Sequence, residues 1–279
     1  MNPELINRLE PFRAEALRRW IPLQDVEGWI AAARPCATLV TRGDGPVVGR
    51  FGGPLLLPAD VPDPWFPLLA TLDCAALPEE VTGLPLPADG RLLLFGFPDL
   101  PSYSAPAGEV VYIPEGTPVE ERTTKNDGYD DSVYEQFPQE ELRLAPDVSM
   151  ASHFLVRSEE RGGEAVTLPG HPRAWELAET WEQTYGDIVV DGPLHIGGYA
   201  SHECTEADPV MDAADEAKDA RRFRGDTTEL PAPEEWVLLA QWDIGLDGRE
   251  GSTLHWVIPR QDLADRRFDR AHVSFFWNP

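Results

Sequence analysis

The sequence predicts an α+β fold: an internally duplicated, mainly antiparallel β-sheet scaffold with N-terminal helices and one amphipathic mid-chain helix. Three observations lead to this prediction. Short apolar runs alternate with Pro, Gly and Asp, which is typical of strands joined by turns. The chain has 28 prolines and 23 glycines in 279 residues, which excludes a long helical bundle because both residues weaken helices. One order of motifs also recurs in the two halves of the chain.

The first residues predict helices. Apolar side chains recur there at helical spacing, and Pro11 divides the stripe into two short helices. The stripe consists of Leu5, Leu9, Phe12, Leu17 and Trp20. A third helix is expected over residues 25–33, with Asp25 as its cap and an end before Pro35, because the residue preceding a proline disfavours the α region.

The apolar runs that follow predict strands at residues 36–41, 54–57, 68–72, 91–97, 110–113 and 152–157. Residues 115–147 are polar and acidic, so they predict a long surface excursion with little core of its own. The amphipathic mid-chain helix is expected over residues 172–185, ending at Gly186. Residues 213–223, rich in alanine and charge, predict a short solvated helix.

The recurring order is a glycine pair, an apolar strand ending in Asp, and a strand that begins with Gly. The matching positions are Gly52 and Gly197, Asp73 and Asp243, and Gly90 and Gly251. The prediction is one compact domain, residues 1–279, with repeat 1 at about 36–114, an acidic insert at about 115–150 and repeat 2 at about 151–279. The alternative is a chance recurrence of Leu-Leu-Ala in a chain rich in both residues.

These motifs resemble the YwqG-like family, bacterial proteins built around a domain of unknown function. The residues that carry the resemblance are Gly52-Gly53-Pro54-Leu55, Leu68-Leu-Ala-x-x-Asp73, Gly90-x-Leu92-x-x-Phe95, His195-x-Gly-Gly-Tyr199, Leu238-Leu-Ala-Gln-x-Asp243 and Asp262-Leu263. The resemblance implies an α+β fold rich in antiparallel strands and supplies no established reaction. Because some relatives are said to sit near secreted-toxin systems, it suggests an immunity-type or partner-binding role.

The charge of the chain points to a class of partner. With 49 Asp and Glu against 23 Lys and Arg, the net charge is −26 and the pI is about 4.4. Such a surface opposes binding to nucleic acid, whose affinity comes from basic residues, and favours a basic protein partner. The residues expected to bind it are Asp127, Asp130, Asp131, Glu203, Glu206 and Asp208. No signal peptide or apolar run long enough for a membrane is found, so a cytoplasmic location is expected.

The chain contains no recognised catalytic motif, so no catalytic residue is assigned. The candidate ligand-binding residues are Asp73, Asp243, His195, Trp65 and Trp236. If a twofold axis relates the repeats, Asp73 and Asp243 could meet as an acid/base pair; the alternative is that each caps the turn after its strand. The set His195, His202, Glu203 and Cys204 lacks the further ligands of a zinc deaminase, so no metal and no cofactor is expected.

The leading functional hypothesis is therefore a non-enzymatic binding or interaction protein, with acidic surface segments engaging a basic protein partner such as a toxin domain. The alternative is an enzyme or small-ligand binder that uses a cleft between the two repeats, with Asp73, Asp243 and His195 as its polar groups. A deep, polar-lined pocket between the repeats would favour the alternative. The sequence indicates no oligomeric state.

Overall fold

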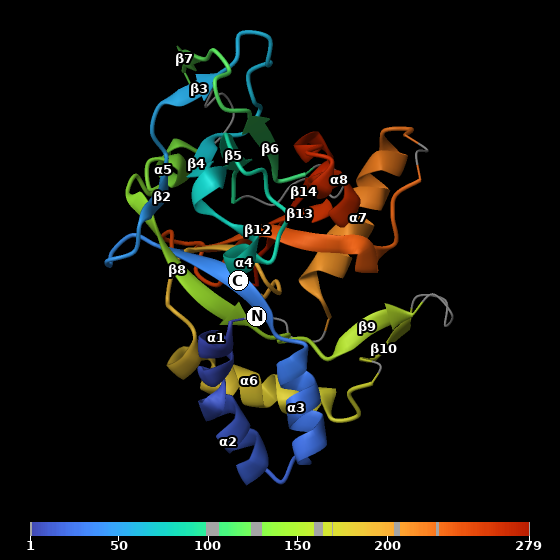
Figure 1. Cartoon of the computed structure of the whole chain (residues 1–279). Helices are drawn as coiled ribbons and strands as arrows, with labels where there is room; N and C mark the ends of the chain where they lie inside the picture. The colour runs from blue at the N-terminus through green and yellow to red at the C-terminus, as the bar shows by residue number, and fades with distance from the viewer. Residues whose placement is uncertain are drawn as a thin grey trace.

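A single large β-sheet organises the molecule. The computed structural model describes residues 2–98, 106–123, 130–158, 164–168, 170–203, 207–226 and 229–278. The ten strands of the sheet are β1 (Arg34–Val40), β2 (Val47–Phe51), β4 (Leu68–Asp73), β5 (Arg91–Gly96), β6 (Gly108–Ile113), β8 (Glu141–Ser149), β11 (Leu194–Gly197), β12 (Trp236–Ile244), β13 (Ser252–Pro259) and β14 (His272–Phe276). Their order is β14-β13-β12-β11-β1-β8-β2-β4-β5-β6, and every neighbouring pair is antiparallel (Figure 1).

The sheet curves until its two edges meet. Ala107 N–H, just before β6, donates a hydrogen bond to the carbonyl of Val273 in β14 at 2.8 Å. The indole N–H of Trp256 in β13 donates to the carbonyl of Phe95 in β5 at 3.1 Å. Apolar side chains from both halves are thereby enclosed in one core, which includes Leu69, Leu72, Leu94, Leu239, Trp242 and Trp256. Two small two-stranded sheets flank it, β3 (Leu55–Leu57) with β7 (Glu120–Arg122) and β9 (Leu155–Ser158) with β10 (Glu164–Thr167).

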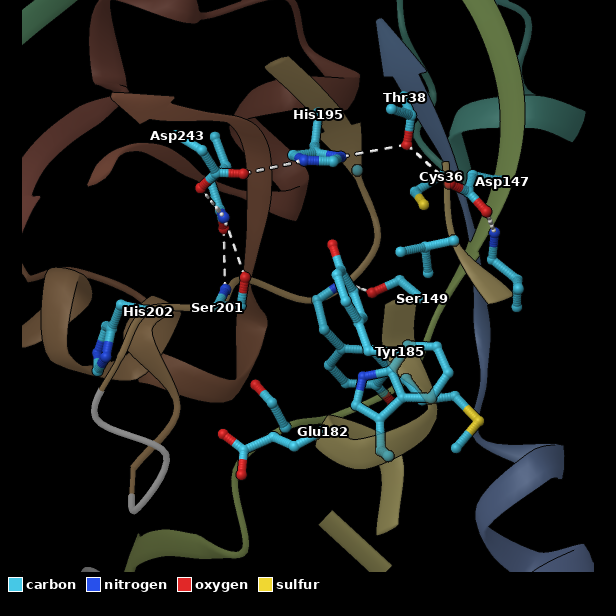
Figure 2. A pocket seen from close by; sticks show the side chains of 18 residues that line it. Cys36, Thr38, Asp147, Ser149, Glu182, Tyr185, His195, Ser201, His202 and Asp243 are labelled. Atoms are coloured by element: carbon cyan, nitrogen blue, oxygen red, sulfur yellow. Dashed lines mark hydrogen bonds and ion pairs between the residues drawn. The ribbon is translucent and has the colours of Figure 1, made fainter. Parts of the chain in front are cut away.

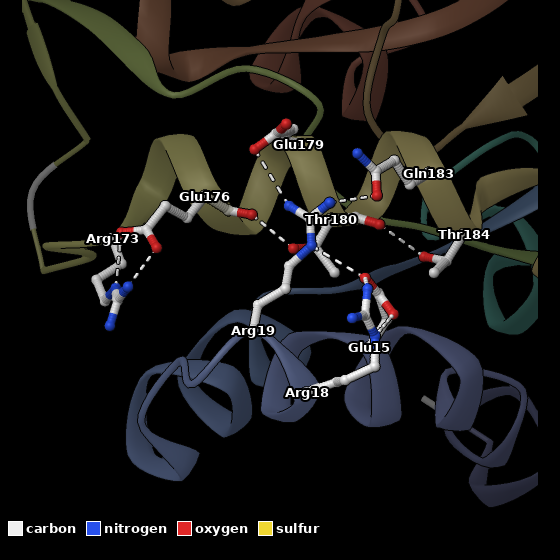
Figure 3. Close-up of polar contacts among 9 residues, drawn as sticks. All are labelled: Glu15, Arg18, Arg19, Arg173, Glu176, Glu179, Thr180, Gln183 and Thr184. Atoms are coloured by element: carbon white, nitrogen blue, oxygen red, sulfur yellow. Dashed lines mark hydrogen bonds and ion pairs between the residues drawn. The ribbon is translucent and has the colours of Figure 1, made fainter.

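Helices cover two parts of the sheet. They are α1 (Pro3–Asn7), α2 (Glu10–Arg18), α3 (Leu23–Ala31), α4 (Glu79–Thr82), α5 (Asp131–Tyr134), α6 (Ala174–Ile188), α7 (Pro209–Phe223) and α8 (Arg260–Ala264). In Figure 1, α1, α2, α3 and α6 gather below the sheet, and their apolar faces form a second core with Val148 of β8 and with Met150, which follows that strand. Figure 3 shows Arg19, just after α2, donating to Glu179 and Gln183 of α6. The α+β prediction is confirmed. None of the described helices could span a lipid bilayer.

The helices differ from the predictions in detail. Leu17 and Trp20 are 41% and 88% exposed, whereas Ala16 and Ile21 fill the core places expected for them. The cause is that α2 ends at Arg18 and Trp20 takes a left-handed conformation, φ 61°, which turns its side chain outward. The third helix starts at Leu23, so Asp25 lies inside its first turn and is not its cap.

Two later helices also extend beyond their predicted limits. Helix α6 continues past Gly186 to Ile188, since that glycine keeps a right-handed conformation. Helix α7 begins four residues before the predicted start, at Pro209, after the cap Asp208. One face of α7 is buried against the sheet, where it contacts Trp236, Leu238 and Val257. The residues of that face are Val210, Ala213, Ala214 and Ala217. Its alanines therefore form a contact face.

The expected surface excursion over residues 115–147 is wrong, because β8 occupies its last part and lies at the centre of the sheet between β1 and β2. Leu142, Leu144 and Val148 are buried. Charged residues such as Glu141 and Arg143 alternate with the apolar ones on this strand, so the segment reads as acidic although one face is core.

The strand order is relevant to the proposed duplication. On one side of the central pair β1–β8 lie β2, β4, β5 and β6, and on the other lie β11, β12, β13 and β14. The first half pairs Arg50 with Thr71, and the second pairs His195 with Gln241. These residues stand two positions before the matched glycines and the matched Asp residues, so the pairing registers agree. The internal duplication itself stays a prediction.

Candidate functional site

A cavity of about 300 Å³ lies between helix α6 and the strands β1, β8, β11 and β12. We call it the central hollow. Its lining residues include Thr38 of β1, Asp147 of β8, Tyr185 of α6, His195 of β11 and Asp243 of β12. In Figure 2, the sheet residues form the upper wall and Tyr185 and Glu182 rise from α6 below. Each strand contributes alternate residues to this face, because side chains along a strand point to opposite sides.

Asp147 anchors one end of the site. Its carboxylate is 1% exposed and lies 2.8 Å from the guanidinium of Arg8, the residue that follows α1. It accepts further hydrogen bonds from the backbone N–H groups of Val148 at 2.9 Å and Val190 at 2.8 Å. Arg8 also donates to the carbonyl of Ile188 at the end of α6. The buried charge is therefore neutralised and ties the N-terminal helix, the sheet and α6 together.

From Asp147 a chain of hydrogen bonds crosses the sheet (Figure 2). The Thr38 hydroxyl lies 2.9 Å from an Asp147 carboxylate oxygen and 3.2 Å from His195 Nδ1. His195 Nε2 lies 3.1 Å from the carboxylate of Asp243. The imidazole is thus held between a hydroxyl and a carboxylate.

The chain continues beyond Asp243. The Gln241 side-chain amide donates to Asp243 at 2.8 Å and to the Ser201 hydroxyl at 3.0 Å. The side-chain Oε1 of Gln241 accepts from the Ser201 backbone N–H at 2.8 Å. The Ser201 carbonyl lies 2.9 Å from Nε2 of His255 on β13. The loop after β11 is therefore fastened to β12 and β13, and the sheet wall of the hollow is preorganised.

Gly197 and Gly198 make the turn that closes this wall. Their φ angles are 73° and 78°, in the left-handed region that glycine occupies at no steric cost. A Cβ atom at Gly198 would lie 2.8 Å from Cβ of Ser149 and 2.9 Å from Cβ of Cys36. Only glycine lets the chain pass so close to β1 and β8 before Tyr199 turns back.

Aromatic side chains form the opposite wall. Trp181 and Tyr185 of α6 pack edge to face with ring centroids 5.5 Å apart. Burial raises the pKa of the Tyr185 phenol, and the carboxylates of Asp243 and Asp147 raise it further. Tyr199 carries the guanidinium of Arg34 over its ring at 4.0 Å. Tyr185 is thus a neutral phenol at physiological pH, with 39% of its surface exposed.

Two further residues of the hollow are uncharged for the same reason. Burial raises the pKa of the Cys36 thiol, and the nearby Asp147 carboxylate adds to the shift. Burial lowers the pKa of His202 to about 4, with a contribution from His255. The His202 ring stacks on Phe276 at a centroid distance of 4.0 Å. A protonated thiol is a poor nucleophile, so Cys36 does not supply covalent chemistry.

Asp243 lies where three cavities meet. It lines the central hollow, a second cavity of about 620 Å³ bounded by residues 40–45 and 190–193, and a third of about 380 Å³ bounded by Glu203 and residues 251–253. Its side chain is 43% exposed. A molecule bound in any of the three would contact this carboxylate.

The structure brings together two of the candidate ligand-binding residues, His195 and Asp243. The hypothesis of an Asp73–Asp243 pair is wrong, because β4 and β12 are separated by four strands in the sheet order. Asp73 instead accepts a hydrogen bond from the N–H of Ala75 at 3.0 Å and caps the turn after its strand. Trp236 is buried under α7, and Trp65 is 75% exposed in the first half, so neither lines the central hollow.

The acidic residues expected to contact a partner are only partly described. Asp127 and Glu206 lie outside the described residues, and so does Cys204. Asp130 and Asp208 accept backbone hydrogen bonds at the starts of α5 and α7, each at 2.9 Å. Asp131 is the first residue of α5.

The chain has two acidic segments, residues 115–147 and 203–219, and described parts of both approach the same turn, residues 245–251 between β12 and β13. The Gln136 side chain, just after α5, accepts a hydrogen bond from the N–H of Asp247 at 2.8 Å. Glu203 is exposed and lies against Gly251 at the other end of the turn. The two segments therefore border one surface.

Sequence reasoning missed Asp147, Thr38 and Gln241. Asp147 was assigned to the acidic insert, although the alternation of Leu142 and Leu144 with the charged residues Glu141 and Arg143 was a usable strand signal. Within the ranges that the structure describes, no three His, Cys, Asp or Glu side chains are arranged to hold a metal ion.

Comparison with known families supplies one match. A family model described as "Domain of unknown function (DUF1963)" matches residues 49–276. The match includes both halves of the sheet except β1 and the first two residues of β2, and all of the central hollow except the residues that β1 contributes. A search of curated proteins finds no match.

Proposed function

The chain belongs to the DUF1963 family, and we propose that it is a non-enzymatic binding protein whose ligand enters the central hollow. The hydrogen-bond chain from Arg8 to His255 carries the proposal. It fixes polar groups on one wall of a cavity whose other wall is aromatic. A largely apolar cavity with a few oriented polar groups is the usual form of a ligand site.

The polar groups favour binding over catalysis. His195 contacts a hydroxyl and a carboxylate, as in a hydrolase triad, but Thr38 has no exposed surface and also bonds Asp147. Its oxygen is therefore shielded from a substrate. Cys36 is kept as a thiol by its raised pKa.

We further propose that the chain is a YwqG-like member of the family and that it works in the cytoplasm. The motifs around Gly52, Asp73 and His195 support the first statement. The free, buried thiols of Cys36 and Cys74 support the second, because such thiols persist in reducing compartments.

The test is a ligand panel measured by ligand-observed NMR. The panel contains small amines, guanidines, carboxylates, sugars and nucleotides, and each binding signal is measured again with the variant Ser152→Trp. Ser152 lines the hollow and is half-buried, so the indole would fill the cavity. We expect at least one class to bind the native protein and to lose its signal with Ser152→Trp.

The control is Glu121→Gln, an exposed change on β7 in the first half. It should leave every binding signal unchanged. If no compound in the panel distinguishes the native protein from Ser152→Trp, the hollow is not a ligand site and the proposal fails.

A second candidate function is supported by the surface around residues 245–251. Because the two acidic segments border this turn, a basic protein partner of the immunity type could contact both at once. Binding would be steered by charge and would weaken steeply as salt is added. Affinity capture at about 50 and 500 mM salt tests this proposal. It is contradicted if the recovered proteins are not enriched in basic ones, or if their recovery does not depend on the salt concentration.

A further inference from the structure

We infer that the central hollow is a site for a cationic group, an alkylammonium or guanidinium, held between the Asp243 and Glu182 carboxylates and the Tyr185 ring. The inference rests on the proposed function and specifies its ligand class. Three independent observations support it: the hydrogen-bonding groups that remain on the sheet wall, the charge of the lining, and the position of Tyr185.

The sheet wall offers acceptors and few donors. Both N–H groups of the Gln241 amide are used, one on Asp243 and one on Ser201. Both ring nitrogens of His195 already face protein oxygens. Each Asp243 oxygen has a further lone pair, and the Ser149 hydroxyl oxygen, which accepts from Tyr199 N–H, has a second lone pair. A ligand rich in N–H donors matches this wall.

The charge of the lining is negative. Among the described residues that line the hollow, Asp147, Glu182 and Asp243 carry carboxylates, and none is a lysine or an arginine. The Asp147 charge is balanced by Arg8, which lies outside the lining. Glu182 and Asp243 therefore leave the lining with an excess of negative charge.

The neighbouring cavities extend this field. Among the described residues that line the three cavities meeting at Asp243, six are acidic and one is an arginine, Arg42. Carboxylates in a shared concavity raise the local concentration of cations. Arg8 is already engaged by Asp147 and the Ile188 carbonyl, and Arg34 lies over the Tyr199 ring.

Tyr185 supplies the third element. Its ring is exposed at the hollow, one helical turn from Glu182 on the same face of α6, and Figure 2 shows both side chains on the wall opposite His195. A cation over an aromatic face is stabilised by the ring's negative quadrupole. The face of Tyr199 already carries Arg34, so Tyr185 is the aromatic ring placed for a ligand.

The experiment compares matched probes by calorimetry or NMR titration: n-butylguanidinium and n-butylammonium, the neutral n-butylurea, and the anion butyrate. We expect the cations to bind at least about tenfold more tightly than the urea, and butyrate not to bind. Asp243→Asn should weaken cation binding by about tenfold and Glu182→Gln by a smaller factor. Glu121→Gln should change it less than about twofold.

Variants at Tyr185 give a second test, because Asp243→Asn could lose binding through misfolding alone. Tyr185→Leu removes the ring and should weaken cation binding several-fold, and Tyr185→Phe, which keeps the ring, should restore most of that loss. Near-ultraviolet circular dichroism checks the fold of each variant. Equal binding of urea and guanidinium, tighter binding of butyrate, or equal effects of Asp243→Asn and Glu121→Gln would overturn the inference.

One more titration decides whether the cation comes from a basic protein or from a small molecule. An oligolysine peptide is titrated with and without saturating butylammonium, and again with Ser152→Trp. Competition and loss in the variant identify a lysine or arginine side chain of a basic protein as a ligand; binding of the free amine alone identifies a small molecule. Binding of neutral or anionic panel members that Ser152→Trp removes would refute the cation inference and leave the proposed ligand site standing.

Discussion

The two halves of the sheet place the same motif in different surroundings. Asp73 closes β4 and caps a turn, whereas Asp243 lies in β12 and bonds His195 and Gln241. In the matching register of the first half, Arg50 stands where His195 stands in the second. A motif fixes the strand and its end, but the neighbouring strand and the covering helix decide whether its carboxylate is a cap or part of a site.

The largest effect on stability is expected at Asp147, which lies near the end of β8 that the helices cover. Asp147→Ala should lower the free energy of unfolding by about 3–5 kcal/mol, because it leaves Arg8 and two backbone N–H groups without their buried partner. Urea denaturation measures it. Glu141→Ala, an exposed site at the other end of the strand, should cost less than about 1 kcal/mol; equal costs would refute the assigned role of Asp147.

The glycine pairs give the second comparison. Gly198→Ala should cost about 2–3 kcal/mol, because a left-handed alanine is strained and its methyl group would meet Cβ atoms of Ser149 and Cys36. Gly53→Ala has the same strain, but its methyl group would meet only the movable side chain of Arg50, so about 1 kcal/mol is expected. Thermal and chemical denaturation rank the two, and the reverse ranking would contradict the packing described for the second turn.

The halves should also differ in acid sensitivity, because all six histidines lie between residues 153 and 272. Burial lowers the pKa of His202 from 6.5 to about 4. The unfolded chain then binds a proton between these pH values while the folded chain does not, so stability falls as pH drops from about 6.5 to 4. His202→Phe, which keeps a ring on Phe276, should reduce the difference between denaturation midpoints at pH 7.5 and pH 5. An unchanged difference would show that His202 is not the source.

The smallest effect on stability is expected at Asp73, which caps the turn after β4. Asp73→Ala should lower the free energy of unfolding by about 1 kcal/mol through loss of its hydrogen bond to Ala75 N–H. Ligand binding in the central hollow should be unaffected, in contrast to Asp243→Asn. A loss of binding with Asp73→Ala would mean that the two halves are coupled.

Local pattern was sufficient for much of the sheet. The runs at 68–72, 91–97 and 110–113 coincide with β4, β5 and β6 to within a few residues, because their apolar residues and flanking breakers are contiguous in the chain. Two of the candidate ligand-binding residues, His195 and Asp243, are hydrogen-bonded in the structure; their role in a site stays a prediction.

What local pattern could not supply is the pairing of distant strands. The neighbours of β1 are β8 and β11, over a hundred residues further along the chain. The partner of Asp243 therefore depends on register across strands, which a single sequence does not encode in a short window. Trp20 illustrates the opposite error: helical spacing placed it in the core, but the helix ends before it and it points to solvent.

The position of β1 in the sheet has a consequence for how the protein is made on the ribosome. The strand is synthesised early, yet its two neighbours follow much later, and the Arg8 contacts with Pro146 and Ile188 span 138 and 180 residues. Until then both edges of β1 lack their partners, a state that invites mispairing. The centre of this sheet is thus completed late in translation, after the strands of the first half have emerged.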